Sequence, residues 1–227
     1  MIIKGRRQDL DQQAANLLAQ SLKAALARQP QVSFGVVGGR SVENVLKLLG
    51  SEQVDWSRVH LFMVDERLVP SDHPDSNYNL VFPVVSSYMV SANLHPFLQE
   101  PGQEQAALER YRRKLDPHGG RLEVLLLSSG EDGHIGSLFP EHETIDSPDD
   151  YFLVTKSAPK PPPQRMSASP RLISRASSAV LLFFGKGKQQ AFKNCLDDAV
   201  PVRECPAAIV RTIENHFILR DSEGGYS

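Results

Sequence analysis

The stretch LEVLLLSSGEDGHIGSLFP, residues 122–140, decides the fold because it joins an apolar run to a polar turn. Residues 122–127 are almost all aliphatic, which is typical of a strand that is covered on both faces of a sheet. Gly130 and Gly133 flank an acidic pair, so the backbone is free to turn sharply after this strand. The apolar residues that follow, between 135 and 139, anchor the turn. The stretch therefore predicts a buried strand that ends in a fixed polar loop.

Further apolar runs with the same organisation lie on both sides of this stretch. Residues 32–37 end in a glycine pair and precede a helical pattern, residues 59–64 end in Asp-Glu-Arg, and residues 179–184 end in Gly-Lys-Gly-Lys. Helical spacing of apolar side chains is found at 9–28, 103–115, 186–196 and 207–213, and shorter strands are expected at 151–155 and 216–219. Strands that alternate with helices predict the α/β class. We expect a single Rossmann-like domain over residues 1–227, with a mostly parallel sheet flanked by helices.

Composition excludes several classes of protein. The chain has 227 residues, of which 41% are hydrophobic and 23% charged, and its formal net charge is -2. This balance gives no reason to expect nucleic acid or a membrane as a partner. Cys195 and Cys205 form no CxxC pair and the N-terminus has no signal-peptide pattern, so we expect a cytoplasmic protein. We also expect a monomer or a weak dimer.

Polar clusters occur where the predicted strands end. They occupy residues 38–41, 65–67, 130–134 and 185–188. In open parallel sheets, ligands bind beyond the carboxyl ends of the strands, and these ends lie at one edge of the sheet. The four clusters are therefore expected to form one site.

His134 is the strongest catalytic candidate in the chain. A histidine with a near-neutral pKa is a natural general base for activating water, and Asp132 stands two residues before it to orient the imidazole. The alternative is that Asp132-Gly133 is an ordinary turn with a surface histidine. The preceding buried strand and the following apolar anchor favour the catalytic interpretation.

Asp65 and Arg67 stand at the end of another predicted strand. Asp65 is suited to hold a water molecule or a substrate hydroxyl. Arg67 is suited either to neutralise an anion or to tie down the loop at 72–77 through a structural bond, and the sequence leaves both roles open.

Cations and free backbone N–H groups indicate a phosphate site. Gly39, Arg40 and Ser41 open a predicted helix, and a helix N-terminus binds anions readily. Arg165 follows a proline-rich stretch, which we expect to be a stiff loop that holds the guanidinium in place. Lys188 follows a predicted strand. Each of these signals is weak alone.

The remaining histidines show no metal-ligand spacing in the sequence. We therefore assign no metal and no cofactor, and expect activity to survive chelation. These residues are His60, His73, His95, His118, His142 and His216.

Taken together, the motifs resemble those of the 6-phosphogluconolactonases over nearly the whole chain. DER with SNY, and DGHxxSLFP, are specific in combination, whereas GGRS and GKGK are not. In chain order the motifs are Gly38-Gly39-Arg40-Ser41, Val64-Asp65-Glu66-Arg67 with Ser76-Asn77-Tyr78, and residues 130–140, 160–165, 185–188 and 206–209.

The resemblance implies hydrolysis of 6-phospho-D-glucono-1,5-lactone, a sugar phosphate lactone, and the fold of sugar-phosphate isomerases and glucosamine-6-phosphate deaminases. It implies that His134 is the base with Asp132 beside it, and that Asp65 and Arg67 line the site. Residues that match the family's phosphate-binding positions are Ser41, Arg165 and Lys188.

The chain departs from the family in its loop, which usually reads GxGxDGHTAS. Ser128, Ile135 and Gly136 stand where the family has glycine, threonine and alanine. A deaminase is an alternative, but that family has DEY in place of DER and a glutamate where this chain has Phe139. A sugar-phosphate sensor without catalysis is a second alternative, and the retained Asp65 and His134 argue against it.

Overall fold

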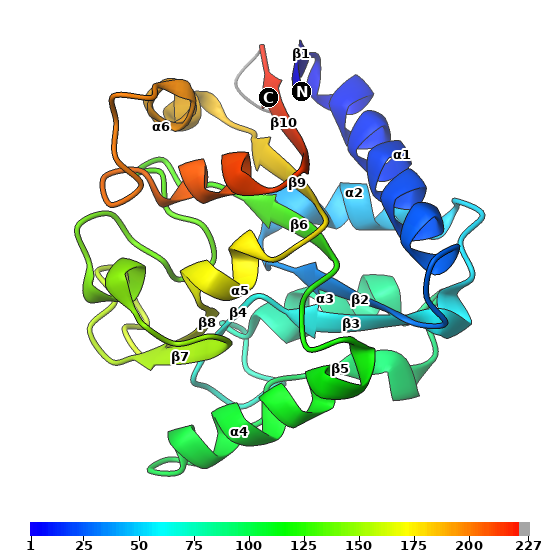
Figure 1. The fold of residues 1–227 in the computed structure, drawn as a ribbon, viewed down its shortest axis with the longest axis vertical. Coiled ribbons are helices and arrows are strands. Elements are labelled where there is room, and N and C mark those ends of the chain that lie inside the picture. The colour runs from blue at the N-terminus through cyan, green and yellow to red at the C-terminus, as the bar shows by residue number, and fades with distance from the viewer. Residues whose placement is uncertain (223–227) are drawn as a thin grey trace.

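The computed structural model describes residues 1–222, and its centre is a seven-stranded sheet in which every strand pair is parallel. Its strands follow one another down the middle of Figure 1. In spatial order they are β1 (Ile2–Gly5), β10 (Asn215–Asp221), β9 (Ser178–Phe183), β6 (Val124–Ser128), β2 (Val32–Val36), β3 (Val59–Met63) and β5 (Leu94–His95).

Helices cover both faces of this sheet. On one face α1 (Arg7–Leu26) packs against α2 (Arg40–Gly50), which packs against α3 (Asn77–Val85). The other face carries α5 (Pro170–Ser174), α6 (Gln189–Leu196) and the 3₁₀ helix η6 (Pro206–Thr212), while α4 (Glu104–Leu115) lies near β5 (Figure 1). Shorter 3₁₀ helices are η1 (Trp56–Arg58), η2 (Ser91–Asn93), η3 (Asp116–His118), η4 (Glu143–Asp146) and η5 (Lys186–Lys188). Within residues 1–222, no helix has the length and apolarity needed to cross a bilayer.

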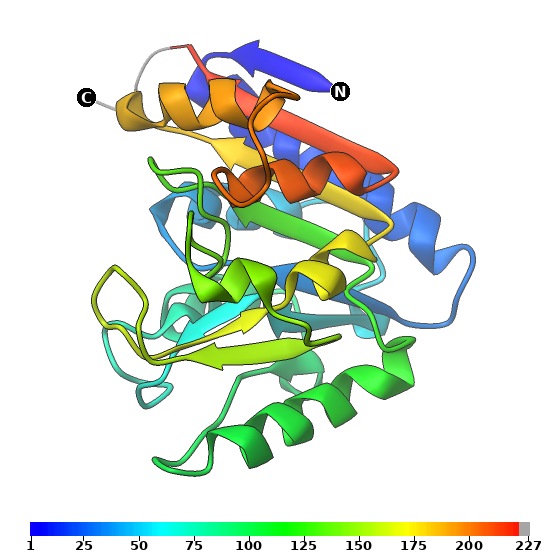
Figure 2. The same cartoon turned by 60° about the vertical axis from the view of Figure 1, so that its left-hand side comes forward.

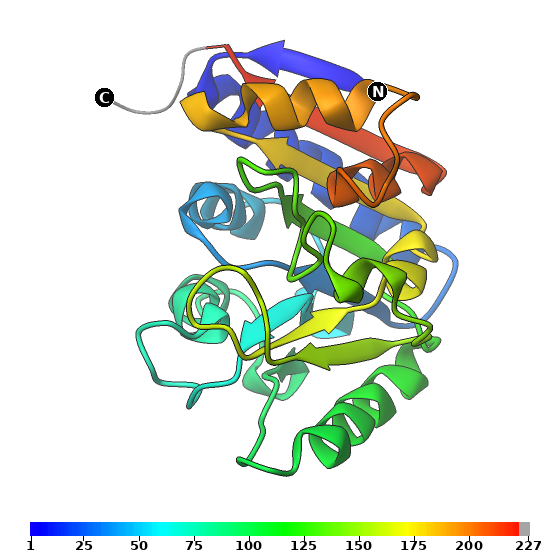
Figure 3. The same cartoon turned by 90° about the vertical axis from the view of Figure 1, so that its left-hand side faces the viewer.

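The predicted parallel α/β sheet is confirmed, but a second sheet was not predicted. It is three-stranded and antiparallel, and consists of β4 (Asp65–Arg67), β8 (Arg165–Ala168) and β7 (Phe152–Thr155). It lies on the α5 side of the large sheet (Figures 2 and 3). The backbone N–H of Ala168 donates to the carbonyl of Val64 at 2.6 Å, which joins this sheet to the end of β3. The strand predicted at 151–155 is confirmed as β7. β4 and β8 are short strands that form only where distant segments pair, so local sequence patterns do not predict them or the sheet.

Complete burial explains why the central strands are mostly apolar, with Ser33, His60 and Ser178 as the polar residues of β2, β3 and β9. Every residue of β2, β3 and β9 is buried. Phe34, Phe62 and Phe183 are among the largest side chains that lie fully inside the protein. Both faces of these strands meet helices or the small sheet, so an alternating polar pattern has no place there.

The strand register aligns the carboxyl ends of the central strands. Val36 pairs with both Met63 and Leu126, and Ser128 pairs with Leu182. The segments that follow these strands therefore leave the sheet at one edge, as the sequence predicted.

Replacing Phe34 with alanine tests this core. Phe34 is 0% exposed, and the Phe34→Ala cavity should lower the free energy of unfolding by about 3–5 kcal/mol. Urea denaturation measures the change. The matched control is Leu80→Ala on α3, because Leu80 is 47% exposed and its removal should cost less than about 1 kcal/mol. Equal losses in the two variants would contradict the assignment of Phe34 to the central core.

Candidate functional site

A cleft of about 220 Å³ lies at the carboxyl edge of the large sheet. All of the predicted site residues except Asp132 and Arg40 line it. The lining consists of Val37, Gly38, Gly39, Ser41, Asp65, Arg67, Asn77, Ser128, Ser129, Gly130, His134, Gly136, Arg165 and Lys188. Segments far apart in sequence thus share one small cavity.

His134 forms a charged cluster with Asp132 and Lys160. Its Nδ1 lies 2.5 Å from Oδ1 of Asp132, and Nζ of Lys160 lies 2.9 Å from Oδ2 of the same carboxylate. Burial by itself raises the pKa of Asp132, but the hydrogen bond to His134 and the ion pair with Lys160 outweigh it and hold that pKa below its ordinary value. Asp132 therefore stays ionised. Lys160 begins the 160–165 motif, but the sequence did not indicate its approach to His134, because that approach depends on loop packing.

Glycines shape the loop that presents His134. The backbone N–H of Gly130 donates to the carbonyl of His134 at 2.9 Å, and a Cβ at Gly130 would lie 2.1 Å from the imidazole. Gly133 has φ +91°, a left-handed conformation that favours glycine, and its carbonyl accepts the N–H of Ala207 at 2.9 Å. The loop is thus fixed from within and from η6.

Asp65 is buried at the floor of the cleft. Its Oδ2 accepts a hydrogen bond from Oγ of Ser137 at 3.1 Å, and its backbone carbonyl accepts one from Nδ2 of Asn77 at 3.0 Å. The side chain is 5% exposed. One carboxylate oxygen is therefore held by the protein, which fixes the direction of the other.

Glu66 is a supporting residue to which the sequence analysis gave no role. Its carboxylate accepts hydrogen bonds from the backbone N–H groups of Asn77 at 2.6 Å and Tyr78 at 2.8 Å, and from Oγ of Ser76 at 3.1 Å. An anion at the start of α3 satisfies N–H groups that the helix leaves without partners. The pairing of an acid with a later SNY helix start is the signal that could have identified it.

Arg67 combines both of the roles that were left open. Its Nη1 donates to the carbonyl of Asp75 at 2.7 Å, so it does tie down the 72–77 loop. It also lines the cleft, where its Nε is buried without a hydrogen-bond partner. The side chain of Arg67 thus holds the loop and also brings positive charge to the cleft.

The start of α2 requires both of its preceding glycines. A Cβ at Gly38 would lie 2.0 Å from Oδ1 of Asn77, and Gly39 has φ +109°. The first N–H groups of a helix have no intrahelical partners. Gly39 and Ser41 line the cleft, so the start of α2 borders it. The predicted anion position at this helix is consistent with the geometry.

Arg40 does not lie in this cleft, in contrast to the prediction. It is exposed and lines a neighbouring cavity of about 550 Å³ together with Arg7, Asn44 and Lys47. It is the first residue of α2, and the helical turn that brings Ser41 to the cleft directs Arg40 away from it.

Arg165 lies in the cleft, but not on the proline loop where it was expected. It begins β8 and pairs with Arg67 across the small sheet. Its Nε donates to the carbonyl of Pro162 at 2.9 Å, and its Nη2 donates to those of Lys160 at 3.1 Å and Pro161 at 3.0 Å. Arg165 therefore fixes the loop at residues 160–162 through these hydrogen bonds, whereas we expected the loop to fix Arg165. Burial and the charge of Arg67 lower the pKa of Arg165. An anion beside both arginines would raise this pKa again.

Lys188 reaches the cleft from η5 and donates from Nζ to Oγ of Ser128 at 3.1 Å. Burial, with a contribution from the charge of Arg7, lowers the pKa of Lys188 to about 8. Ser128 stands where the resembled family has glycine, and its hydroxyl positions this ammonium group. The substitution therefore has a local structural role.

The cleft places an oriented imidazole near a set of anion-binding groups. The carboxylate of Asp132 fixes the imidazole of His134, while Arg67, Arg165 and Lys188 supply positive charge. This combination suits hydrolysis of a substrate that carries a separate anionic group.

Comparison with known proteins gives consistent results. Residues 5–219 match the family model described as glucosamine-6-phosphate isomerases/6-phosphogluconolactonase. A 6-phosphogluconolactonase of Borreliella burgdorferi is 34% identical over 193 residues, which cover 82% of each chain.

Solved structures share the fold. A 6-phosphogluconolactonase from Shewanella baltica superposes with a TM-score of 0.85 at 22% identity, covering 98% of this chain and 97% of the other. The enzyme of the same name from Trypanosoma brucei gives a TM-score of 0.81 at 25% identity, covering 98% of this chain and 96% of the other.

Proposed function

This chain belongs to the glucosamine-6-phosphate isomerase/6-phosphogluconolactonase family, and from that premise we propose that it hydrolyses 6-phospho-D-glucono-1,5-lactone to 6-phospho-D-gluconate. The observation that carries the proposal is the His134–Asp132 pair in a cleft that also contains Arg67, Arg165 and Lys188. The reaction is a step of the oxidative pentose phosphate pathway, and we place it in the cytoplasm.

In this mechanism His134 activates water. The carboxylate of Asp132 is only an acceptor, so it accepts a hydrogen bond from Nδ1–H, and the lone pair of the neutral ring is then on Nε2. The ammonium group of Lys160 forms an ion pair with the same carboxylate, with Nζ 2.9 Å from Oδ2, and helps to keep Asp132 ionised. Asp132 and Lys160 thereby set the tautomer in which Nε2 acts as the base.

Water attacks C1 of the lactone while Nε2 of His134 takes its proton. The new C–O bond gives a tetrahedral oxyanion, which is stabilised by hydrogen-bond donors in the cleft. Arg67 is our candidate donor, because its side chain lines the cleft. The intermediate then breaks the bond from C1 to the ring oxygen, and the imidazolium returns the proton to that oxygen. A lactone is an activated ester, so weak acid assistance suffices.

Contacts to the phosphate group of the substrate orient C1 for this attack. The helix start at Ser41, together with Arg165 and Lys188, would hold the phosphate, and Asp65 would accept a hydrogen bond from a sugar hydroxyl. A remote phosphate contributes to the rate because it fixes C1 near the activated water.

Phe139 argues against the deaminase alternative. It is buried, and its ring centroid lies 4.8 Å from that of His134, at the position where the deaminases carry a glutamate. An apolar ring there cannot take part in acid–base relay. A turnover assay with the phosphorylated lactone separates an enzyme from a sensor that only binds.

His134→Ala tests the base. We expect kcat to fall by about two to four orders of magnitude because the general base is lost. Steady-state hydrolysis, corrected for the spontaneous reaction, measures the change, and an unaltered melting temperature shows that the fold persists. Asp132→Asn should also lower kcat, since an amide no longer holds the tautomer. A His134→Ala enzyme with near-normal kcat would rule out this mechanism.

Arg165→Ala tests the phosphate site. A charge-assisted contact contributes about 1.5–3 kcal/mol, so kcat/KM for the phosphorylated lactone should fall about 10- to 150-fold. Hydrolysis of unphosphorylated gluconolactone should suffer much less. The control is Lys186→Ala, an exposed cation outside the cleft lining. Equal losses on both substrates would mean that Arg165 acts only by holding the 160–162 loop.

The lowered pKa of Lys188 predicts that binding of the product, 6-phosphogluconate, depends on pH. A pKa of about 8 means that Lys188 is charged below that pH and loses its proton above it. If Lys188 binds the phosphate, the Kd of 6-phosphogluconate should rise about tenfold between pH 7 and pH 9. Calorimetric titration measures this, with Lys188→Arg as the control that keeps its charge. The same rise in both proteins would exclude Lys188 as its origin.

A further inference from the structure

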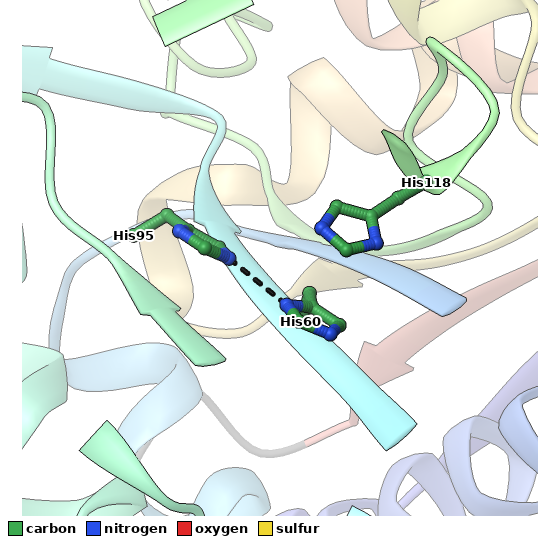
Figure 4. A group of neighbouring side chains, drawn as sticks. All are labelled: His60, His95 and His118. Atoms are coloured by element: carbon green, nitrogen blue, oxygen red, sulfur yellow. Dashed lines mark hydrogen bonds between the residues drawn. The ribbon is translucent and has the colours of Figure 1, made fainter. Parts of the chain in front are cut away.

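Three histidines from separate segments meet at the opposite end of β3 from the catalytic cleft. His60 lies near the start of β3, His95 ends the edge strand β5, and His118 ends η3, directly after α4. One ring nitrogen from each lies within 4.8 Å of those of the other two, and Figure 4 shows His95 and His118 on either side of His60. The residues are 35 and 23 positions apart, so no spacing in the sequence reveals the group.

These rings form a partly buried group with unused nitrogens. His60 is 8% exposed, and its Nδ1 lies 3.0 Å from Nε2 of His95, a distance at which one nitrogen donates to the other. Nε2 of His60 and Nδ1 of His118 are buried without hydrogen-bond partners. Buried polar atoms in proteins are nearly always paired, so two orphaned nitrogens in one cluster indicate a missing partner.

The three rings are neutral at physiological pH. Burial, with a further contribution from neighbouring histidines, lowers the pKa of His60 and of His95 to about 4, and burial lowers that of His118. The nearby ammonium of Lys114 also lowers the pKa of His95, and that side chain is exposed. A neutral imidazole offers a lone pair, which is the form that binds metals.

We propose that His60, His95 and His118 bind a divalent cation of the zinc class. Three imidazole nitrogens and one water are a ligand set that suits Zn²⁺, with Zn–N distances of about 2.0–2.1 Å. Two nitrogens of a tetrahedral zinc site are then roughly 3.3 Å apart, and His60 Nδ1 and His95 Nε2 already lie 3.0 Å apart. With His60 bound through Nδ1, its orphaned Nε2 stays outside the site, and Nδ1 of His118 is the orphaned atom that the cation would satisfy. No carboxylate or cysteine of residues 1–222 belongs to the group, so hard cations such as Mg²⁺ are disfavoured.

The ring of His118 must turn for this cation to bind. It stacks on that of His60 with centroids 3.8 Å apart, and stacked rings do not direct their lone pairs at one point. His118 is half-buried and is the last residue of η3. Gly119 and Gly120 follow it with positive φ, a backbone conformation that glycine adopts easily. The binding therefore needs a local side-chain rotation and no rearrangement of the sheet.

The cation would stabilise the fold and take no part in the reaction. It would add a link between the end of α4 and the paired strands β3 and β5, beside the hydrogen bonds that Tyr111 of α4 makes with the backbone of Met63 and His95. His60 is the second residue of β3, and Asp65 follows the carboxyl end of that strand, five residues along the chain, which is roughly 16 Å of extended backbone. Lactone hydrolysis should consequently survive EDTA.

Zinc titration of the metal-free full-length protein tests the inference. Calorimetry should show one Zn²⁺ per chain, and Co²⁺ should give the visible absorption of a four-coordinate site. At a zinc concentration of about 100 times Kd, the melting temperature should rise by about 5–10 °C. His118→Ala, and independently His95→Gln, should weaken binding at least about tenfold and, at the same zinc concentration, reduce the thermal shift to about half or less.

His73→Asn is the matched control, because His73 is an exposed histidine outside the cluster. It should bind zinc as the unaltered protein does. Absence of binding by the unaltered protein would overturn the inference. Equal binding by the unaltered protein and His118→Ala would also overturn it, since the ion would then occupy another site, and His134→Ala would show whether that site is the catalytic cleft. Either result leaves the proposed lactonase activity intact.

Discussion

Parallel pairing of seven strands is the constraint on which the rest of the structure depends. Parallel strands need crossover helices, and these helices bury both faces of the sheet. The same geometry sends every strand out of the sheet at one edge, so the segments after β2, β3, β6 and β9 meet there. A catalytic loop, a helix start and separate cations become neighbours without any of them being close in sequence.

Within this edge the cleft holds like charges close together. Arg67 and Arg165 are paired residues of the small sheet, and Lys188 approaches from the other side. The lowered pKa values of Arg165 and Lys188 reflect the cost of burying these cations beside other positive charges. Asp65, Asp75 and Glu66 offset only part of that cost at Arg165. In the mechanism proposed above, the phosphate of the substrate would offset more of it.

The two histidine groups differ in what surrounds them. His134 has an ionised carboxylate and an ammonium group beside it, which fixes one tautomer and suits proton transfer. His60, His95 and His118 face mainly one another, without a carboxylate, which favours neutral rings and metal binding. The different chemistry that we propose for the two groups thus follows from the charges that the fold places next to each histidine.

The sequence by itself determined the parallel α/β core, the position of its strand ends and the loop that carries Asp132 and His134. These features follow from local periodicity and from glycines at positions that require positive φ or close approach. Tertiary structure alone decided the small antiparallel sheet, the displacement of Arg40 from the cleft and the use of Arg165 to hold loop carbonyls. It also brought the three histidines together. Each of these depends on which distant segments pack side by side, and hydrogen bonds across such contacts leave no periodic mark in the chain.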